Sequence, residues 1–194
     1  MVSTDQVKEL RDKTGISVMQ CKKALEDAGG DMEKALGLLK AKGAEIALKK
    51  GNRALKSGTV TAYIHSNGNV GAMVLLSCET DFVARNEEFK ALAYDIAMHI
   101  TAMNPEFTAE KDITAEHKET ARELFQKEVD DSEKPDNIKE KMLAGKINTY
   151  FKEKTLLDQQ FIKDPEKTIG DLITASIQKF GENIEVAQFI RLSI

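Results

Sequence analysis

The sequence has 194 residues, of which 41% are hydrophobic and 31% are charged, and its formal net charge is −4. This composition is ordinary for a globular protein and excludes collagen-like, low-complexity and highly charged disordered chains. The longest near-apolar run, residues 70–78, is far too short to span a bilayer, and no basic or apolar leader follows Met1. We therefore expect a cytoplasmic protein that makes no contact with a membrane.

The two cysteines, Cys21 and Cys78, lie far apart in the sequence. Neither belongs to a C-x-x-C pair or to a Cys/His cluster, which excludes a disulfide framework and a structural zinc site. We expect both to be buried, reduced thiols, as free cysteines usually are.

Charge is distributed unevenly along the chain. Residues 1–56 contain 12 Lys and Arg against 8 Asp and Glu, whereas residues 57–194 contain 16 against 24. The basic side chains gather between residues 40 and 56, where they could contact an acidic partner or RNA. A solvated connector between domains is the more frequent meaning of such a run, and no direct binding of nucleic acid is expected.

Residues 1–43 show helical spacing and predict a module of three short helices. Each predicted helix begins at a capping residue and ends near a glycine. The expected ranges, each beginning at its cap, are Thr4 to about Lys13, Ser17 to Ala28, and Asp31 to Gly43. Residues 44–56, with Gly51-Asn52 as a flexible point, are then predicted to form a basic linker.

The pattern changes at Gly58 from helical spacing to alternation. Residues 58–65 alternate apolar and polar side chains, 66–69 have turn composition, and 70–78 are almost continuously apolar. This pattern predicts a β-hairpin whose second strand is central in its sheet and is covered by the helix that follows.

The remaining residues predict helices and one final strand. A helix with an apolar stripe from Phe89 to Met103 is stopped by Asn104-Pro105. A helical hairpin follows, with its second helix beginning at Pro135. The last predicted segments are a loop at 157–165, a helix boxed by Thr168 and Asp171 and ending at Gly181, and a strand at 184–191.

These elements predict an α+β protein in which a small antiparallel sheet packs against helices, because the strands group together and no strand-helix-strand unit repeats. The predicted division is a three-helix module at 1–43, a basic linker at 44–56 and an α+β core at 57–194.

Catalytic chemistry finds no support in the sequence. Gly145-Lys146 lacks the upstream glycine of a phosphate-binding loop, and no dinucleotide fingerprint or nucleophile elbow is present. His65, His99 and His117 fall on three different predicted elements, without a cysteine or carboxylate at ligand spacing. We expect no enzyme activity, no catalytic residue, no metal and no cofactor.

Two segments carry a specific family resemblance. Residues 7–15, 19–25 and 30–35 (VKELRDKTG, MQCKKAL and GDMEKA) resemble the amino-terminal signature of the elongation factor Ts family. Residues 78–86 (CETDFVARN), together with Phe89, are similar to its second signature and follow the predicted hairpin as they do in that family. Weaker similarities continue through residues 96–105, 160–165 and 186–191.

The resemblance implies a non-enzymatic guanine nucleotide exchange factor in translation elongation that promotes GDP release from elongation factor Tu. It further implies that the first module is ubiquitin-associated-like and contacts the GTPase domain of Tu, while the core contacts that domain and Tu's distal β-barrel. Longer relatives carry two core modules, so this chain is similar to a short subgroup in which two copies pair. We expect such a homodimer to be noncovalent and to form through an exposed sheet edge, since the predicted last strand has no cysteine.

The resemblance also implies which residues bind Tu. Phe82 is expected to enter a pocket of the GTPase domain and to displace elements around the magnesium and phosphates, with Asp81 accepting hydrogen bonds beside it or capping the helix that follows. Lys163 stands where some relatives have methionine. The residues that the resemblance assigns to the contact are Lys22, Val70, Gly71, Thr80, Asp81, Phe82, Val83, His99, Ile162 and Lys163.

The residues themselves leave other interpretations open. Phe82 could pack into its own core, Gly71 could be an ordinary strand glycine, and His99 could be partly buried beside its helix neighbours. The alternative function is a protein- or RNA-binding adaptor that carries a ubiquitin-associated-like module.

Overall fold

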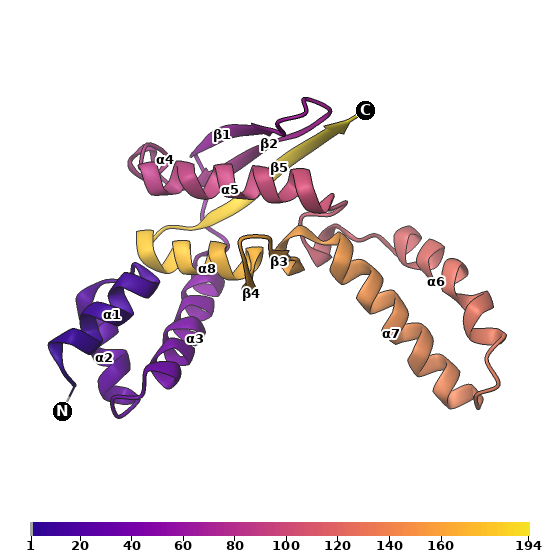
Figure 1. The fold of residues 1–194 in the computed structure, drawn as a ribbon, viewed down its shortest axis with the longest axis horizontal. Coiled ribbons are helices and arrows are strands. Elements are labelled where there is room, and N and C mark those ends of the chain that lie inside the picture. The colour runs from indigo at the N-terminus through magenta and orange to yellow at the C-terminus, as the bar shows by residue number, and fades with distance from the viewer. Residues whose placement is uncertain (1) are drawn as a thin grey trace. The chain divides into compact units, whose positions relative to one another are not determined.

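The computed structural model describes residues 2–194 and divides them into two compact units. The first unit contains the chain up to Met98 together with Asp171–Ile194, and the second contains His99–Gly170. Figure 1 shows a mixture of helices and short strands, which confirms the predicted α+β class. Within residues 2–194 no helix is both long enough and apolar enough to cross a membrane.

Three helices open the first unit: α1 (Thr4–Thr14), α2 (Val18–Asp27) and α3 (Met32–Lys50). Ser17 and Asp31 cap α2 and α3 as predicted, each accepting a hydrogen bond from the backbone N–H three residues later. The predicted cap of α1 was one residue late, because Ser3 and Gln6 form a reciprocal capping box there. The likeness of these helices to a ubiquitin-associated module stays a prediction.

The helix α3 corrects one predicted boundary. It was expected to end at Gly43, but it continues to Lys50, so residues 44–50 of the expected linker are helical. Gly43 is buried against α8 (Ile169–Phe180), where a Cβ atom would lie 2.9 Å from Gln178 Oε1 and 3.2 Å from Thr174 Cγ2. This glycine therefore permits close packing of two helices and does not terminate one.

The N-terminal helices share a small apolar core around Leu10, Leu25 and Leu39. Cys21 belongs to this core, and its thiol donates to the carbonyl oxygen of Ile16 at 3.6 Å. Both Cys21 and Cys78 are free and buried, as predicted.

The sheet of the first unit has the order β1 (Ser57–Ile64), β2 (Val70–Cys78), β5 (Ile184–Ser193), and both pairings are antiparallel. The predicted hairpin and its central second strand are thereby confirmed. Ala72, Val74 and Leu76 of β2 point to the buried face. Figure 1 shows α5 (Glu87–Met103) running beside this sheet.

The second unit contains the predicted helical hairpin, α6 (Ala115–Asp130) and α7 (Asp136–Lys154), whose core includes Ala121 and Phe151. Pro135 was predicted to be the first residue of the second helix, but it is the N-cap of α7, so the helix begins one residue later than predicted. Two 3-10 turns, Glu110–Asp112 and Leu156–Asp158, flank this hairpin.

The segment expected as a loop at 157–165 instead contains a short β-hairpin. Its strands are β3 (Gln160–Phe161) and β4 (Asp164–Thr168), which pair antiparallel. Two residues are too few to show a period of two, so the sequence pattern gave no sign of β3.

Candidate partner-binding site

Phe82 lies on α4 (Asp81–Ala84), a single helical turn that is separated from the end of β2 by two residues. Its side chain is 85% exposed, while the next residue, Val83, is buried. The ring therefore does not pack into the protein's own core, which removes the alternative left open by the sequence. Because an exposed phenylalanine leaves a large apolar surface in water, its burial by another molecule would be favourable.

Asp81 does not cap the helix, since it is the first residue of α4 and the N-cap is Thr80. Its carboxylate lies 3.2 Å from Nη2 of Arg85, one turn later, and both side chains are largely exposed. Such an exposed pair contributes little stability. The Asp81 carboxylate therefore remains available to accept hydrogen bonds beside Phe82.

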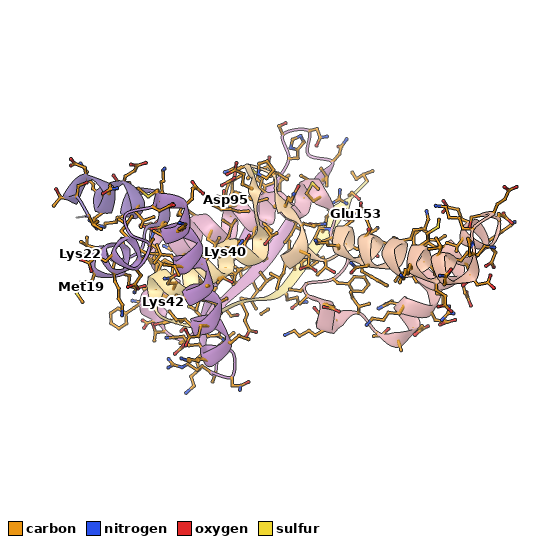
Figure 2. The ribbon with its side chains drawn as sticks, turned by 90° about the horizontal axis from the view of Figure 1, so that it is seen from below. Met19, Lys22, Lys40, Lys42, Asp95 and Glu153 are labelled. Carbon is orange, nitrogen blue, oxygen red and sulfur yellow. The ribbon has the colours of Figure 1, made fainter. Side chains whose placement is uncertain are left out.

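The N-terminal module presents a second exposed group on α2. Lys22 extends into solvent, with only a 3.8 Å approach to Glu26. Met19, on the same helix, is 83% exposed, and Val18 is half exposed. Figure 2 shows Met19 and Lys22 together at the outer side of this module.

Met19 was not singled out from the sequence, although a signal was present. It precedes the buried stripe formed by Cys21, Ala24 and Leu25, so its helical position places it off that stripe. An apolar side chain on the solvent side of a short helix is a candidate contact residue, and together with Lys22 it makes a mixed apolar and basic surface.

Val70 and Gly71 begin β2, at the opposite end of this strand from Thr80. At 3.3 Å per residue the two ends of β2 lie about 26 Å apart, so these residues do not join Phe82 in one patch. A Cβ atom on Gly71 would lie 2.9 Å from the carbonyl oxygen of Tyr63. The close approach that this glycine permits is thus to the neighbouring strand β1.

His99, Ile162 and Lys163 lie in the second unit, and the structure brings them together. Ile162 is 40% exposed and Lys163 is exposed, both in the turn between β3 and β4. His99 is fully buried; its Nδ1 accepts from the backbone N–H of Ile162 at 3.4 Å, and its Nε2 lies 3.0 Å from Oε1 of Gln159. The imidazole is therefore not accessible to a partner. It supports the turn between β3 and β4 from inside the protein through its hydrogen bond to Ile162.

Burial lowers the pKa of His99, against a smaller opposing effect of its hydrogen bond to Gln159. The neutral ring suits its two contacts, because Nδ1 can accept from Ile162 only when it carries no proton. The tautomer with hydrogen on Nε2 then donates to Gln159.

No group of three or more His, Cys, Asp or Glu side chains within residues 2–194 is arranged to hold a metal ion. The arrangement offers contact chemistry: exposed apolar side chains beside a carboxylate in one place, and beside a lysine in two others.

Comparison with known proteins gives one consistent answer. Residues 5–194 match the family model described as elongation factor TS. The chain is 49% identical over 193 residues to the elongation factor Ts of Thermodesulfovibrio yellowstonii, covering 100% of this chain and 96% of that protein. It is 46% identical to the Carboxydothermus hydrogenoformans protein of the same name (100% and 89% covered) and 44% identical to that of Thermosipho melanesiensis (100% and 99% covered).

Proposed function

Because this chain belongs to the elongation factor Ts family, we propose that it is a guanine nucleotide exchange factor for elongation factor Tu. In this role it acts in the cytoplasm during translation elongation. It promotes the release of GDP without transforming a substrate of its own, and it needs no cofactor.

Exchange requires that the protein bind the nucleotide-free GTPase more tightly than the GDP-loaded one, because a ligand with equal affinity for two states does not shift the equilibrium between them. Each tenfold acceleration of release corresponds to about 1.4 kcal/mol, so three to five decades correspond to roughly 4–7 kcal/mol of selective interaction. One side chain does not supply that amount.

The exposure of Phe82 is the observation that carries the proposal. Full burial of such a ring in a partner pocket contributes about 1.5–3 kcal/mol. We assign the ring to the magnesium and phosphate region of the GTPase domain, with Asp81 and Thr80 beside it. Met19 and Lys22 would add contacts to the same domain, and Ile162 and Lys163 would contact Tu's distal β-barrel.

The test is the rate at which labelled GDP leaves purified Tu in the presence of the wild-type protein, Phe82→Ala or Asp81→Ala. We expect wild type to accelerate release and Phe82→Ala to lose about 10- to 150-fold of that acceleration, the equivalent of the burial above. Leu124→Ala is the matched control, because Leu124 is also a well-exposed apolar side chain but lies on α6, a helix that carries none of the proposed contact residues.

The outcomes separate two levels of the proposal. Failure of the wild-type protein to accelerate release would reject the exchange function. Acceleration that Phe82→Ala retains in full would reject the role of the ring and leave the exchange function standing.

We also propose that two copies pair noncovalently through the sheet of the first unit. One face of this sheet is turned away from the core and carries exposed apolar side chains. At the positions that pair across β1, β2 and β5 on this face, no side chain is charged. Burial of these neighbouring apolar side chains against a second copy would be favourable. The residues of this face are Val60, Ala62, Ile64, Gly71, Met73, Leu75, Gln188, Ile190 and Leu192.

The pairing was expected at a sheet edge, but the apolar face is the feature that favours it. Sedimentation of wild type at micromolar concentration should give a dimer, and the double variant Ile64→Thr/Ile190→Thr should give a monomer. A wild-type monomer under these conditions would reject the pairing.

A further inference from the structure

The two residues before Asp81 are bound by a carboxylate from a distant part of the sequence. Glu182 lies between α8 and β5, and its Oε2 accepts from the backbone N–H groups of Glu79 at 3.1 Å and Thr80 at 2.9 Å. Its Oε1 accepts from the hydroxyl of Thr80 at 2.5 Å. One side chain thus receives three hydrogen bonds from two consecutive residues.

The binding is reciprocal, because Glu79 holds the segment that carries Glu182. The carboxylate of Glu79 accepts from the backbone N–H of Asn183 at 2.6 Å. Nη1 of Arg53 lies 3.2 Å and 3.4 Å from its two oxygens. The Asn183 N–H and the Arg53 guanidinium stabilise the charged form of Glu79 and hold its pKa below the usual value.

The polar groups of Thr80 are all engaged. Its N–H and hydroxyl are bound by Glu182, while its carbonyl oxygen accepts from the Cys78 thiol at 3.2 Å and from the N–H of Ala84 at 3.2 Å. The side chain of Thr80 is thereby committed to Glu182 and makes no cap for α4. The backbone that enters α4 therefore has one defined path.

This path matters because α4 cannot fix its own position. It has four residues, far fewer than an isolated helix needs for stability. The exposed ring of Phe82 adds almost no packing of its own. Val83 anchors the turn from inside, but the direction in which Phe82 points depends on the residues on either side.

We infer that Glu182 is a positioning residue for Phe82: with Glu79 it fixes the backbone that enters α4 and so holds the exposed ring in the orientation needed to enter the partner. This inference rests on the proposed function, because it names what prepares Phe82 for that role. A ring held in its bound orientation before docking loses less conformational entropy on binding.

The first part of the test concerns the free protein and does not depend on Tu. Backbone amide hydrogen exchange should show Glu79 and Thr80 protected in wild type and exchanging at least about tenfold faster in Glu182→Ala, since their acceptor is then gone. Glu182→Gln should give an intermediate rate, because its amide has one acceptor oxygen where three donors converge. Unchanged protection in Glu182→Ala would overturn the inference.

The second part measures GDP release from Tu at subsaturating concentrations of wild type, Glu182→Ala, Phe82→Ala and the double variant, where the rate reports docking as well as release. If Glu182 acts through Phe82, its replacement lowers this release rate about tenfold in wild type but less than about twofold when Phe82 is already alanine. Glu123→Ala, which replaces an exposed carboxylate on α6, is the control and should accelerate GDP release from Tu as much as wild type does.

Two results would contradict the inference. Equal losses on replacing Glu182 in both backgrounds would mean that it acts independently of the ring, for example through general stability. Wild-type release rates in Glu182→Ala would mean that it does not act at all. A wild-type protein that fails to accelerate release rejects the proposed function and, with it, the positioning role, whereas the amide exchange still reports whether Glu182 holds the loop.

Discussion

Gly43 gives a sharp test of how α3 packs on α8. In the interior of a helix, replacement of glycine by alanine stabilises by about 1 kcal/mol, because alanine loses less backbone entropy. At Gly43 the new methyl group would lie 2.9 Å from Gln178 Oε1 and 3.2 Å from Thr174 Cγ2. Gln178 is buried and its Nε2 donates to Oε1 of Gln20 at 3.0 Å, so it cannot move without breaking this bond.

Gly37 is the matched position, since it lies in the same helix with nothing within 4 Å of its would-be Cβ. We expect Gly37→Ala to raise the unfolding free energy by about 1 kcal/mol. Gly43→Ala should cancel this gain through overpacking of about 1–3 kcal/mol and end neutral or destabilised.

Calorimetry measures both effects, because 1 kcal/mol shifts the melting temperature of a chain of this size by about 2–4 °C. Gly37→Ala should melt above wild type, and Gly43→Ala at or below it. Equal stabilisation by the two variants would refute the close packing of α3 on α8.

Two further predictions follow from buried titratable groups. Because burial lowers the pKa of His99, the unfolded chain takes up a proton at a higher pH than the folded protein does, so wild type should lose stability as the pH falls from about 7 to 5. Denaturation of wild type and of His99→Gln at both pH values measures this loss of stability, and an equal loss in the two proteins would contradict the prediction. Burial also raises the pKa of Cys78, so its thiol should resist alkylation at pH 8 in the folded protein and react on unfolding. Mass spectrometry after brief iodoacetamide treatment of the folded protein should find Cys78 unmodified. Rapid alkylation of Cys78 in the folded protein would contradict its burial.

Local chemistry made much of the fold predictable from sequence. The capping residues Ser17 and Asp31 and the alternation that begins at Gly58 are local signals, and each produced the predicted element. Gly43 misled because a glycine near basic residues has the same local appearance whether it ends a helix or faces another helix. Its role is decided by Gln178 and Thr174, more than 130 positions away in the sequence.

The candidate site divides in the same way. Phe82 and Asp81 were identified from a family motif, and the structure adds that the ring is exposed. Glu182 could not be found from sequence, since a glutamate after a helix-ending glycine has no pattern that distinguishes it from a solvated one. Only the fold brings it to the N–H groups of Glu79 and Thr80.

The proposed preference for the empty GTPase can be measured as a difference between two binding affinities. Titration calorimetry should compare binding of this protein to nucleotide-free Tu and to Tu saturated with GDP and Mg²⁺. We predict that the protein binds the empty form at least about 1,000-fold more tightly, corresponding to the roughly 4 kcal/mol needed for three decades of acceleration. Phe82→Ala should reduce this ratio of the two affinities. Equal affinity for the two forms would mean that the protein has no such preference and would reject the proposed exchange function.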